Sequence, residues 1–253
     1  MKNKKLISLS ILFILLITLK VINPPIIQKL SFINYDFYQK VFNKGEVKNI
    51  IIIDIDEKSI AQIGQFPWRR DIYSKILNNL NQHNPLAIAF DIVFSEEDKQ
   101  NPKLLLTQLQ KESNQYIDID VPNTNEIFVD SLSKSKVILP ILGEPNESFI
   151  KNNSKPKLRV LAKGTDPRGF IYKYKNKITS LEEINNAASG IGSISLIPSI
   201  DGIIRRIPVL YNIDNLIWPS IALETVRVAT KQKNLLVKSN DYGIELIKTK
   251  KNV

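Results

Sequence analysis

The clearest hydrophobic pattern in the chain lies at its N-terminus. Residues Leu6 to Leu19 are apolar apart from three hydroxyl side chains, and a lysine-rich tip precedes them. No polar face recurs at helical spacing, which argues against a buried core helix. The run is shorter than the roughly 20 residues that a spanning helix needs. Lys20 can snorkel to the interface, however, and Val21-Ile22 extends the run to a stop at Asn23-Pro24-Pro25. The pattern therefore predicts a membrane helix.

The flanks of this run predict its orientation. A basic tip before an apolar run is shared by signal peptides and anchors. No A-x-A-like cleavage site follows, which favours an uncleaved anchor, and the preceding lysines predict a cytoplasmic start. No second run approaches spanning length. We expect residues 1–25 to form the cytoplasmic tip and a single-pass anchor in the inner membrane, and residues 26–253 to form an extracytoplasmic (periplasmic) domain.

Three helices are predicted in the first third of this domain. Apolar side chains fall near one helical face over residues 26–43, which predicts a helix leading out of the membrane and closed near Gly45. A short helix is predicted over Glu57 to Ile63, ended by Gly64. A longer one is predicted over Arg70 to Gln82, with apolar side chains along one side.

Two runs without polar alternation predict buried strands. Asn49 to Asp56 contains four consecutive isoleucines, and Leu86 to Asp91 has the same character. Such runs are typical of strands covered on both faces by helices. A strand, a helix and another strand make a βαβ unit, so these two strands are predicted to be parallel.

The middle of the chain is more polar. We expect a loop over residues 95–123 with one helix near Lys103 to Lys111, then a short helix to about Ser133, capped by Asn123 with Glu126. Lys136 to Leu142 is predicted to be a third strand, and Pro140 indicates that it bends or lies near an edge. Residues 143–168 have the composition of a surface loop.

The last third predicts a hairpin, a helix and two strands. Apolar runs at Gly190–Ile197 and Ile203–Tyr211 flank an Asp201-Gly202 turn, which predicts a β-hairpin. Pro219 begins a helix to about Lys231, and Tyr242-Gly243 turns between two short strands. The predicted fold is an α/β domain with a mixed sheet and a parallel βαβ core, flanked by helices and preceded by the membrane helix.

Composition excludes several kinds of site. The net charge is +10, and the first twenty residues supply four lysines and no acid. The other basic residues are scattered among acids, so no nucleic-acid partner is expected. The absence of cysteine removes disulfides, thiolate nucleophiles and cysteine metal sites. His83, the single histidine, excludes multi-histidine metal sites and argues against a Ser-His-Asp triad.

Three aspartates form the first candidate set. Asp54 and Asp91 end the two predicted parallel strands, and Asp56 lies close by. Ligands gather at the carboxyl ends of strands in open α/β sheets, and carboxylates there can hold Mg²⁺ or Ca²⁺. The alternative, which we favour, is that each acid caps a helix or pairs with an arginine. No metal-loop spacing accompanies them, so neither a metal nor another cofactor is predicted.

Four arginines and Asp201 make up the rest of the candidate set. Arg69 and Arg70 precede a helix and either bind an anion or fork onto the three aspartates; the second is favoured because it also satisfies the acids. Arg205 and Arg206 are predicted on opposite faces of a strand, so that the inward one needs a carboxylate. The resulting candidate ligand or ion-pair site comprises Asp54, Asp56, Arg69, Arg70, Asp91, Asp201, Arg205 and Arg206. The sequence contains no phosphate-binding glycine loop and no nucleophile elbow, so no catalytic residue is predicted.

Six strings taken in order resemble a known family. They are Ile50 to Ser59, Gly64 to Arg70, Ala87 to Phe94, Gly190 to Ile194, Asp201 to Pro208 and Pro219 to Ala222. Together they resemble the CHASE domain of the second numbered type, an extracytoplasmic sensor of bacterial adenylate or guanylate cyclases, histidine kinases and Ser/Thr kinases. The resemblance covers about residues 26–230. It implies an N-terminal anchor, an outside sensory domain, further membrane helices and a cytoplasmic output domain. No such bundle or output motif follows here, so we interpret the chain as a truncated, split or decayed version of a longer receptor.

Three functional hypotheses follow. The first is a non-enzymatic sensory input domain of a transmembrane receptor of the cyclase or kinase type. The second is an extracytoplasmic metal-dependent hydrolase that uses Asp54, Asp56 and Asp91. The third is a structural envelope or interaction protein without a ligand. The partners expected for the first are membrane lipid around the N-terminal helix, an unknown small-molecule or envelope ligand, and a membrane output protein or a second copy.

Overall fold

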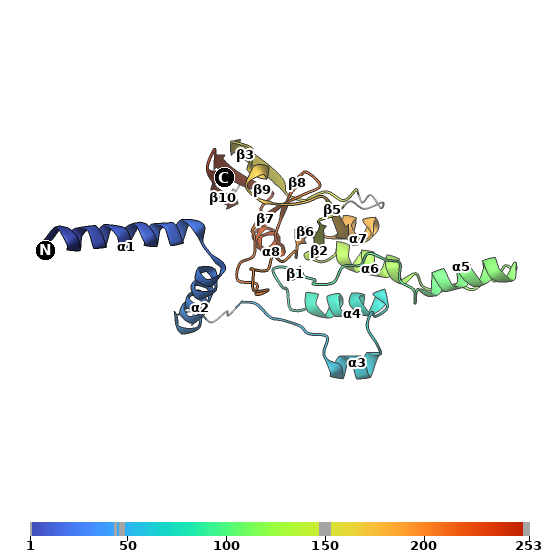
Figure 1. Ribbon diagram of the computed structural model, residues 1–253. Helices are drawn as coiled ribbons and strands as arrows, with labels where there is room; N and C mark the ends of the chain where they lie inside the picture. The colour runs from blue at the N-terminus through green and yellow to red at the C-terminus, as the bar shows by residue number, and fades with distance from the viewer. Residues whose placement is uncertain (1, 43–44, 46–48, 147–152, 250–253) are drawn as a thin grey trace. The chain divides into compact units, whose positions relative to one another are not determined.

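The computed structural model describes residues 2–42, 45, 49–146 and 153–249 (Figure 1). The chain divides into two compact units. One comprises residues 1–55 with 200–202, and the other comprises residues 56–199 with 203–253. The smaller unit contains the predicted anchor, and the larger one contains every sheet described below.

Two helices form the N-terminal part of the smaller unit. Helix α1 spans Lys2–Ile22 and α2 spans Pro25–Phe42, as the hydrophobic pattern predicts. Asn23 ends α1 in the left-handed conformation, with φ 46°, and its N–H donates to the Leu19 carbonyl at 3.0 Å. Proline at the first position of α2 is compatible with a helix start. The predicted end of the second helix near Gly45 adjoins residues 43–44, which lie outside the described part.

The first predicted strand is wrong. Residues 50–55 are irregular in the structure and pair with no strand among the described residues. Ile51 and Ile52 are each 88% exposed. Consecutive β-branched residues favour an extended backbone, but a strand forms only where another edge accepts its hydrogen bonds. The βαβ unit predicted from this segment and Leu86 to Asp91 is therefore not formed.

A four-stranded sheet around β2 (Val137–Glu144) organises the larger unit. The short strand β1 (Ile88–Ala89) and β6 (Gly190–Ser193) run parallel to β2, and β5 (Asn176–Thr179) runs antiparallel to it. Helices α5 (Pro102–Ser113) and α6 (Thr124–Ser133) connect β1 to β2. The predicted mixed α/β fold with parallel pairs is thus confirmed, although other strands supply the parallel core.

Pro140 lies at the centre of this sheet, so of the two predicted alternatives, a bend or an edge position, the edge position is wrong. On one side of β2, the pairing with β1 ends at Ile138 and the pairing with β5 starts at Ile141. The alternation of ladder bonds directs the backbone nitrogen of Pro140 toward that gap and away from β6. A missing N–H therefore costs no ladder bond at this position.

Two further sheets lie in the larger unit. Strand β9 (Asn234–Asn240) pairs in parallel with β3 (Arg159–Gly164) and in antiparallel with β10 (Gly243–Thr249). In the other sheet, β7 (Leu210–Ile213) joins β4 (Tyr172–Tyr174) and β8 (Leu216–Pro219). The final pair of strands was predicted. Strand β3 was not, because its largely exposed, charged sequence has the composition of a loop.

The predicted hairpin at residues 190–211 is wrong as a pairing, although its turn is present. Gly202 has φ +80°, and the Ser199 N–H donates to the Ile203 carbonyl at 3.0 Å. The two flanking runs then enter different sheets, because β6 joins β2 while β7 joins β8. Helix α8 (Ile221–Ala229) begins after Pro219, with Ser220 as its cap.

Helices cover the sheet and bury the aromatic core. Helix α3 (Glu57–Ile63) precedes α4 (Arg70–Asn81), which packs on α6 (Figure 1). Helix α7 (Glu182–Ala187) also contacts α6, and α8 packs against β6 and β2. A short 3₁₀ helix covers Pro167–Gly169. A cluster of rings lies between α4, α6 and the segment after β1 and comprises Trp68, Tyr73, Phe90, Phe94 and Phe128.

Candidate functional site

The three predicted aspartates do not act as a set. Asp56 caps α3, where its carboxylate accepts from the Ser59 N–H at 2.8 Å and from the Ser59 hydroxyl at 2.6 Å. These bonds favour the charged form and lower the pKa of Asp56. The helix-cap alternative is correct for this residue. Asp54 and Asp91 are exposed, and neither makes a hydrogen bond or ion pair with another described residue.

Arg69 and Arg70 do not fork onto those aspartates, so that prediction is wrong. Arg69 instead pairs with Asp71, two residues away, through two bonds of 2.6 and 2.8 Å. Asp71 is favoured over the more distant aspartates because pairing two residues that are only two positions apart restricts very little of the chain. The pair lowers the pKa of Asp71 and raises that of Arg69. Arg70 turns the other way and is buried.

The remaining predicted residues follow β6 in the sequence. Asp201 is exposed at the turn before Gly202, and Arg206 is exposed while Arg205 is half-buried. Neither arginine lies on a strand, because residues 203–209 are irregular, so the prediction of opposite strand faces is wrong. Each of the three side chains or backbones takes part in an interaction, so none of them is without a partner.

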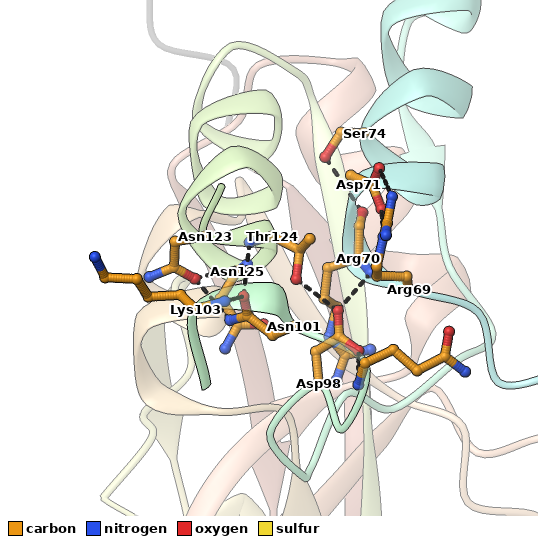
Figure 2. Close-up of polar contacts among 11 residues, drawn as sticks. Arg69, Arg70, Asp71, Ser74, Asp98, Asn101, Lys103, Asn123, Thr124 and Asn125 are labelled. Carbon is orange, nitrogen blue, oxygen red and sulfur yellow. Dashed lines mark hydrogen bonds and ion pairs between the residues drawn. The ribbon is translucent and has the colours of Figure 1, made fainter. Parts of the chain in front are cut away.

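A buried carboxylate that the sequence analysis does not single out, Asp98, accepts hydrogen bonds from three different residues. Figure 2 shows its side chain between the start of α4 and the start of α6. Its oxygens accept from the Arg70 N–H at 2.9 Å, the Thr124 hydroxyl at 2.6 Å and the Gln100 N–H at 3.0 Å. Asp98 is 7% exposed. A buried carboxylate is stable only with such donors, and three of them meet here.

Asparagines extend this network to the start of α5. The Asn101 side-chain oxygen accepts from the Lys103 N–H at 3.1 Å and the Thr124 N–H at 3.2 Å, and its amide donates to Asn123 at 2.8 Å (Figure 2). Asn123 in turn caps α6 and bonds to Glu126, as predicted. The N-termini of α4, α5 and α6 therefore converge on one buried anion, which suits their partial positive charge. We call the residues Arg70, Asp98, Asn101, Asn123 and Thr124 the Asp98 junction.

Arg70 links this junction to the aromatic core. Its guanidinium lies 4.4 Å from the centre of the Phe94 ring, and one terminal nitrogen donates to the Glu96 carbonyl at 2.8 Å. Burial lowers the pKa of Arg70 and raises the pKa of the neighbouring Tyr73. The Arg70 Nε and the Tyr73 hydroxyl are buried and have no hydrogen-bond partner in the described part of the chain. The charged guanidinium of Arg70 loses hydration by its burial, and one carbonyl and one ring compensate for this only in part. Its burial in the charged form therefore depends on the nearby carboxylate of Asp98.

A second buried charge pair holds α8 against the sheet. Glu224 is fully buried and receives two bonds from Arg227, at 2.8 and 2.7 Å. Arg227 also donates to the Ser189 carbonyl at 3.1 Å, just before β6. Lys157 lies near this pair, and burial lowers its pKa. The pair thus links the helix to the strand that it covers.

The hydrogen bonds of these two networks connect elements of the fold to one another. Carboxylates accept from helix starts, and arginines donate to carbonyls and carboxylates within the fold. The described residues contain no group of three or more His, Cys, Asp or Glu side chains placed to hold a metal ion. The hydrolase hypothesis rests on Asp54, Asp56 and Asp91 acting together, and it finds no such cluster in the described part of the chain. The sequence signal for the junction was the Asn101-Pro102 helix start, which lies three residues after Asp98.

The architecture first indicates a general class of protein. It is a mixed α/β domain in a chain with one described helix, residues Lys5–Ile22, long and apolar enough to cross a membrane. The model of the CHASE2 domain family matches residues 9–252, nearly the whole chain, so the chain belongs to that family. CHASE2 domains are extracytoplasmic sensory domains of receptors. No curated protein and no solved structure gives a significant match.

Proposed function

We propose that this chain is the sensory input domain of a transmembrane signalling receptor and lies outside the cytoplasm of the cell that makes it. The observation that carries the proposal is the family match over residues 9–252 in a chain that includes the apolar helix α1. The family supplies the sensory role, and α1 supplies the means of attachment. No catalytic role is assigned to any residue of the chain.

The composition and bonding of α1 support membrane attachment. Eighteen residues from Lys5 to Ile22 make a helix of about 27 Å, close to the roughly 30 Å of a hydrocarbon core. The Ser10 and Thr18 hydroxyls donate to carbonyls four residues earlier, at 3.0 and 2.8 Å. Lipid would therefore meet no unsatisfied donor at these positions. The lysines before the apolar run favour a cytoplasmic N-terminus.

The output that reads the domain is proposed from the family alone. CHASE2 domains belong to receptors, so the expected partner is a cyclase or kinase output domain, either on a continuation of this polypeptide or on a separate membrane protein. Ligand binding outside would favour one of two arrangements of the domain, and the output would respond to that shift in population.

Topology is tested with reporters fused after Val253 of the full chain. Alkaline phosphatase is active only outside the cytoplasm, whereas green fluorescent protein fluoresces only inside it. We expect an active phosphatase and a dark fluorescent protein. The reverse pattern would end the proposal, because an extracytoplasmic sensor cannot have its C-terminus in the cytoplasm after one span.

Sensing is tested by joining the full chain, through added membrane helices, to a cyclase output whose product is measured in cells. The matched control removes residues 26–230 and keeps α1 and the output. We expect the control to lose any response to changes of medium that the complete fusion shows. An output that behaves identically in the two fusions would show that the domain contributes no input.

A further inference from the structure

Helix α2 carries an apolar stripe that its own unit leaves uncovered. Ile26, Leu30, Ile33, Phe37 and Val41 are 72, 58, 65, 60 and 40% exposed. At 100° per residue they fall within an arc of roughly 80° on one side of the helix. No residue of α2 is buried. A stripe of this size is expected to have a partner of its own.

The borders of the stripe are those of a helix at a lipid surface. Lys29, Lys40 and Asp36 lie along one border of the stripe. On the same helical projection they fall roughly 20–60° outside its edge. Tyr38 and Phe42 lie beyond the other border and stack with ring centroids 5.5 Å apart. Lysines that flank an apolar face and aromatic rings beside it are typical of helices that lie in a membrane interface.

The chain also fixes where α2 begins. Only Asn23 and Pro24 separate the end of α1 from the start of α2. Three Cα steps of 3.8 Å span at most about 11 Å, so the first turn of α2 lies near the headgroup layer if α1 spans the bilayer. The left-handed Asn23 and the following prolines end one helix and begin another. This break allows α2 to leave the axis of α1.

A second copy of the chain fits the stripe less well. The spacing of Ile26, Leu30, Ile33 and Phe37 follows a heptad seam, but the next seam position is Lys40. The seam is thus shorter than two heptads, whereas a stable coiled coil needs about three or four. A charged residue at such a position weakens pairing further.

We propose that α2 lies in the membrane–water interface on the extracytoplasmic side of the membrane that α1 spans. Its apolar stripe is inserted among the lipids, and Lys29 and Lys40 lie at the headgroups. The inserted residues are Ile26, Leu30, Ile33, Phe37 and Val41. The inference rests on the proposed membrane attachment through α1. Its consequence is that the sensory domain joins the membrane through a helix parallel to the surface instead of a stalk. Anionic lipid strengthens the contact through the two lysines.

The chain contains no cysteine, so single-cysteine variants report on one site each. Ile33→Cys and Phe37→Cys place an environment-sensitive fluorophore on the stripe. Gln39→Cys places it on another side of α2 as the matched control, and Leu12→Cys places it in α1. Each full-length variant is reconstituted in vesicles of phosphatidylcholine and phosphatidylglycerol. A share of the lipids carries a nitroxide quencher, placed near the top of the acyl chain for the α2 labels and at successive depths for the label at Leu12.

We expect the labels at Ile33 and Phe37 to be quenched several-fold more strongly than the label at Gln39. Equal, water-like emission at all three α2 sites would overturn the inference. Shielded but unquenched labels at Ile33 and Phe37, with disulfides between copies of the unlabelled Ile33→Cys variant under oxidation, would assign the stripe to a second copy and also overturn it. A label at Leu12 that escapes quenchers at every lipid depth would instead overturn the attachment of α1, so the two failures are distinguishable.

Discussion

At the scale of single residues, we expect the hydrogen bonds of Asp98 to make a measurable contribution to the stability of the fold. Asp98→Ala leaves the Arg70 N–H, the Thr124 hydroxyl and the Gln100 N–H without their acceptor and removes the carboxylate near a buried guanidinium. We expect the free energy of unfolding to fall by about 3 kcal/mol. Urea unfolding of the full chain in detergent, followed by the fluorescence of the buried Trp68 and Trp218, measures it.

Asp91→Ala is the control for Asp98, because Asp91 is exposed and bonds to no described residue. We expect this change to alter stability by less than about 0.5 kcal/mol. Equal effects of the two substitutions would contradict the assignment of Asp98 as the acceptor for three donors.

The raised pKa of Tyr211 leads us to predict a loss of stability at high pH. Burial, with a smaller effect of Tyr174, raises its pKa from 10.0 to about 12, and its hydroxyl donates to the Ser195 carbonyl at 2.6 Å. The folded state therefore keeps a proton that the unfolded state releases. The contribution is complete below about pH 10 and is lost as the pH rises to about 12, by about 3 kcal/mol.

The comparison with Tyr211→Phe isolates this contribution. The variant lacks the hydroxyl and is less stable at about pH 8, but between about pH 10 and 12 its stability should fall less steeply than that of the wild type. Unfolding by urea at each pH and tyrosinate absorbance give the two measurements. Parallel pH profiles would contradict the raised pKa.

At the scale of elements, Gly192 sets how closely α8 approaches β6. A Cβ at this position would lie 2.5 Å from the Ile221 Cα and 2.8 Å from the Ile221 nitrogen. Because these are backbone atoms, Gly192→Ala must push the helix from the strand, and we expect a loss of about 2 kcal/mol. Gly169→Ala is the control, since its Cβ meets nothing within 4 Å. Thermal unfolding of both variants decides the prediction, and a neutral Gly192→Ala would refute it.

The isoleucine segment at residues 50–53 gives a second prediction at this scale. Ile52 is 88% exposed, so Ile52→Ser should change the free energy of unfolding by less than about 0.5 kcal/mol. Ile138→Val is the buried reference and should cost about 1 kcal/mol. A larger loss from Ile52→Ser than from Ile138→Val in urea unfolding would mean that the segment is a buried strand, as its sequence pattern predicts.

The elements also show what a sequence can and cannot predict. Helices α3, α4 and α5 follow from local signals: Asp56 and Asn101 cap helix starts, and Gly64 ends one. Strand partners do not follow, because pairing is decided by distant segments. Pro140 indicated a bend or an edge position, and the gap between β1 and β5 accommodates it at the centre of the sheet. Of the eight predicted site residues, Asp56 has its favoured role as a helix cap. Asp98 was missed because its three donors come from residues 70, 100 and 124.

At the scale of the whole molecule, we expect the charge at the N-terminus to control on which side of the membrane the proposed sensory domain is placed. Three lysines precede the apolar run, whereas Lys20, Lys29 and Lys40 follow or end it. The bias toward a cytoplasmic N-terminus is therefore small and depends on Lys2, Lys4 and Lys5 together with the terminal amine. Replacing these three lysines with glutamate leaves the basic residues only beyond the run, which favours retention of that side in the cytoplasm.

We expect the variant with Lys2→Glu, Lys4→Glu and Lys5→Glu to lose roughly half or more of the phosphatase activity of a reporter fused after Val253, with a matching gain of green fluorescence in the parallel fusion. Substitution of the same lysines by arginine keeps the charge and should leave both signals unchanged. If the glutamate variant kept the full outside signal, the lysines would not orient the chain. The proposed position of the domain outside the cytoplasm would then depend on the hydrophobic segment alone.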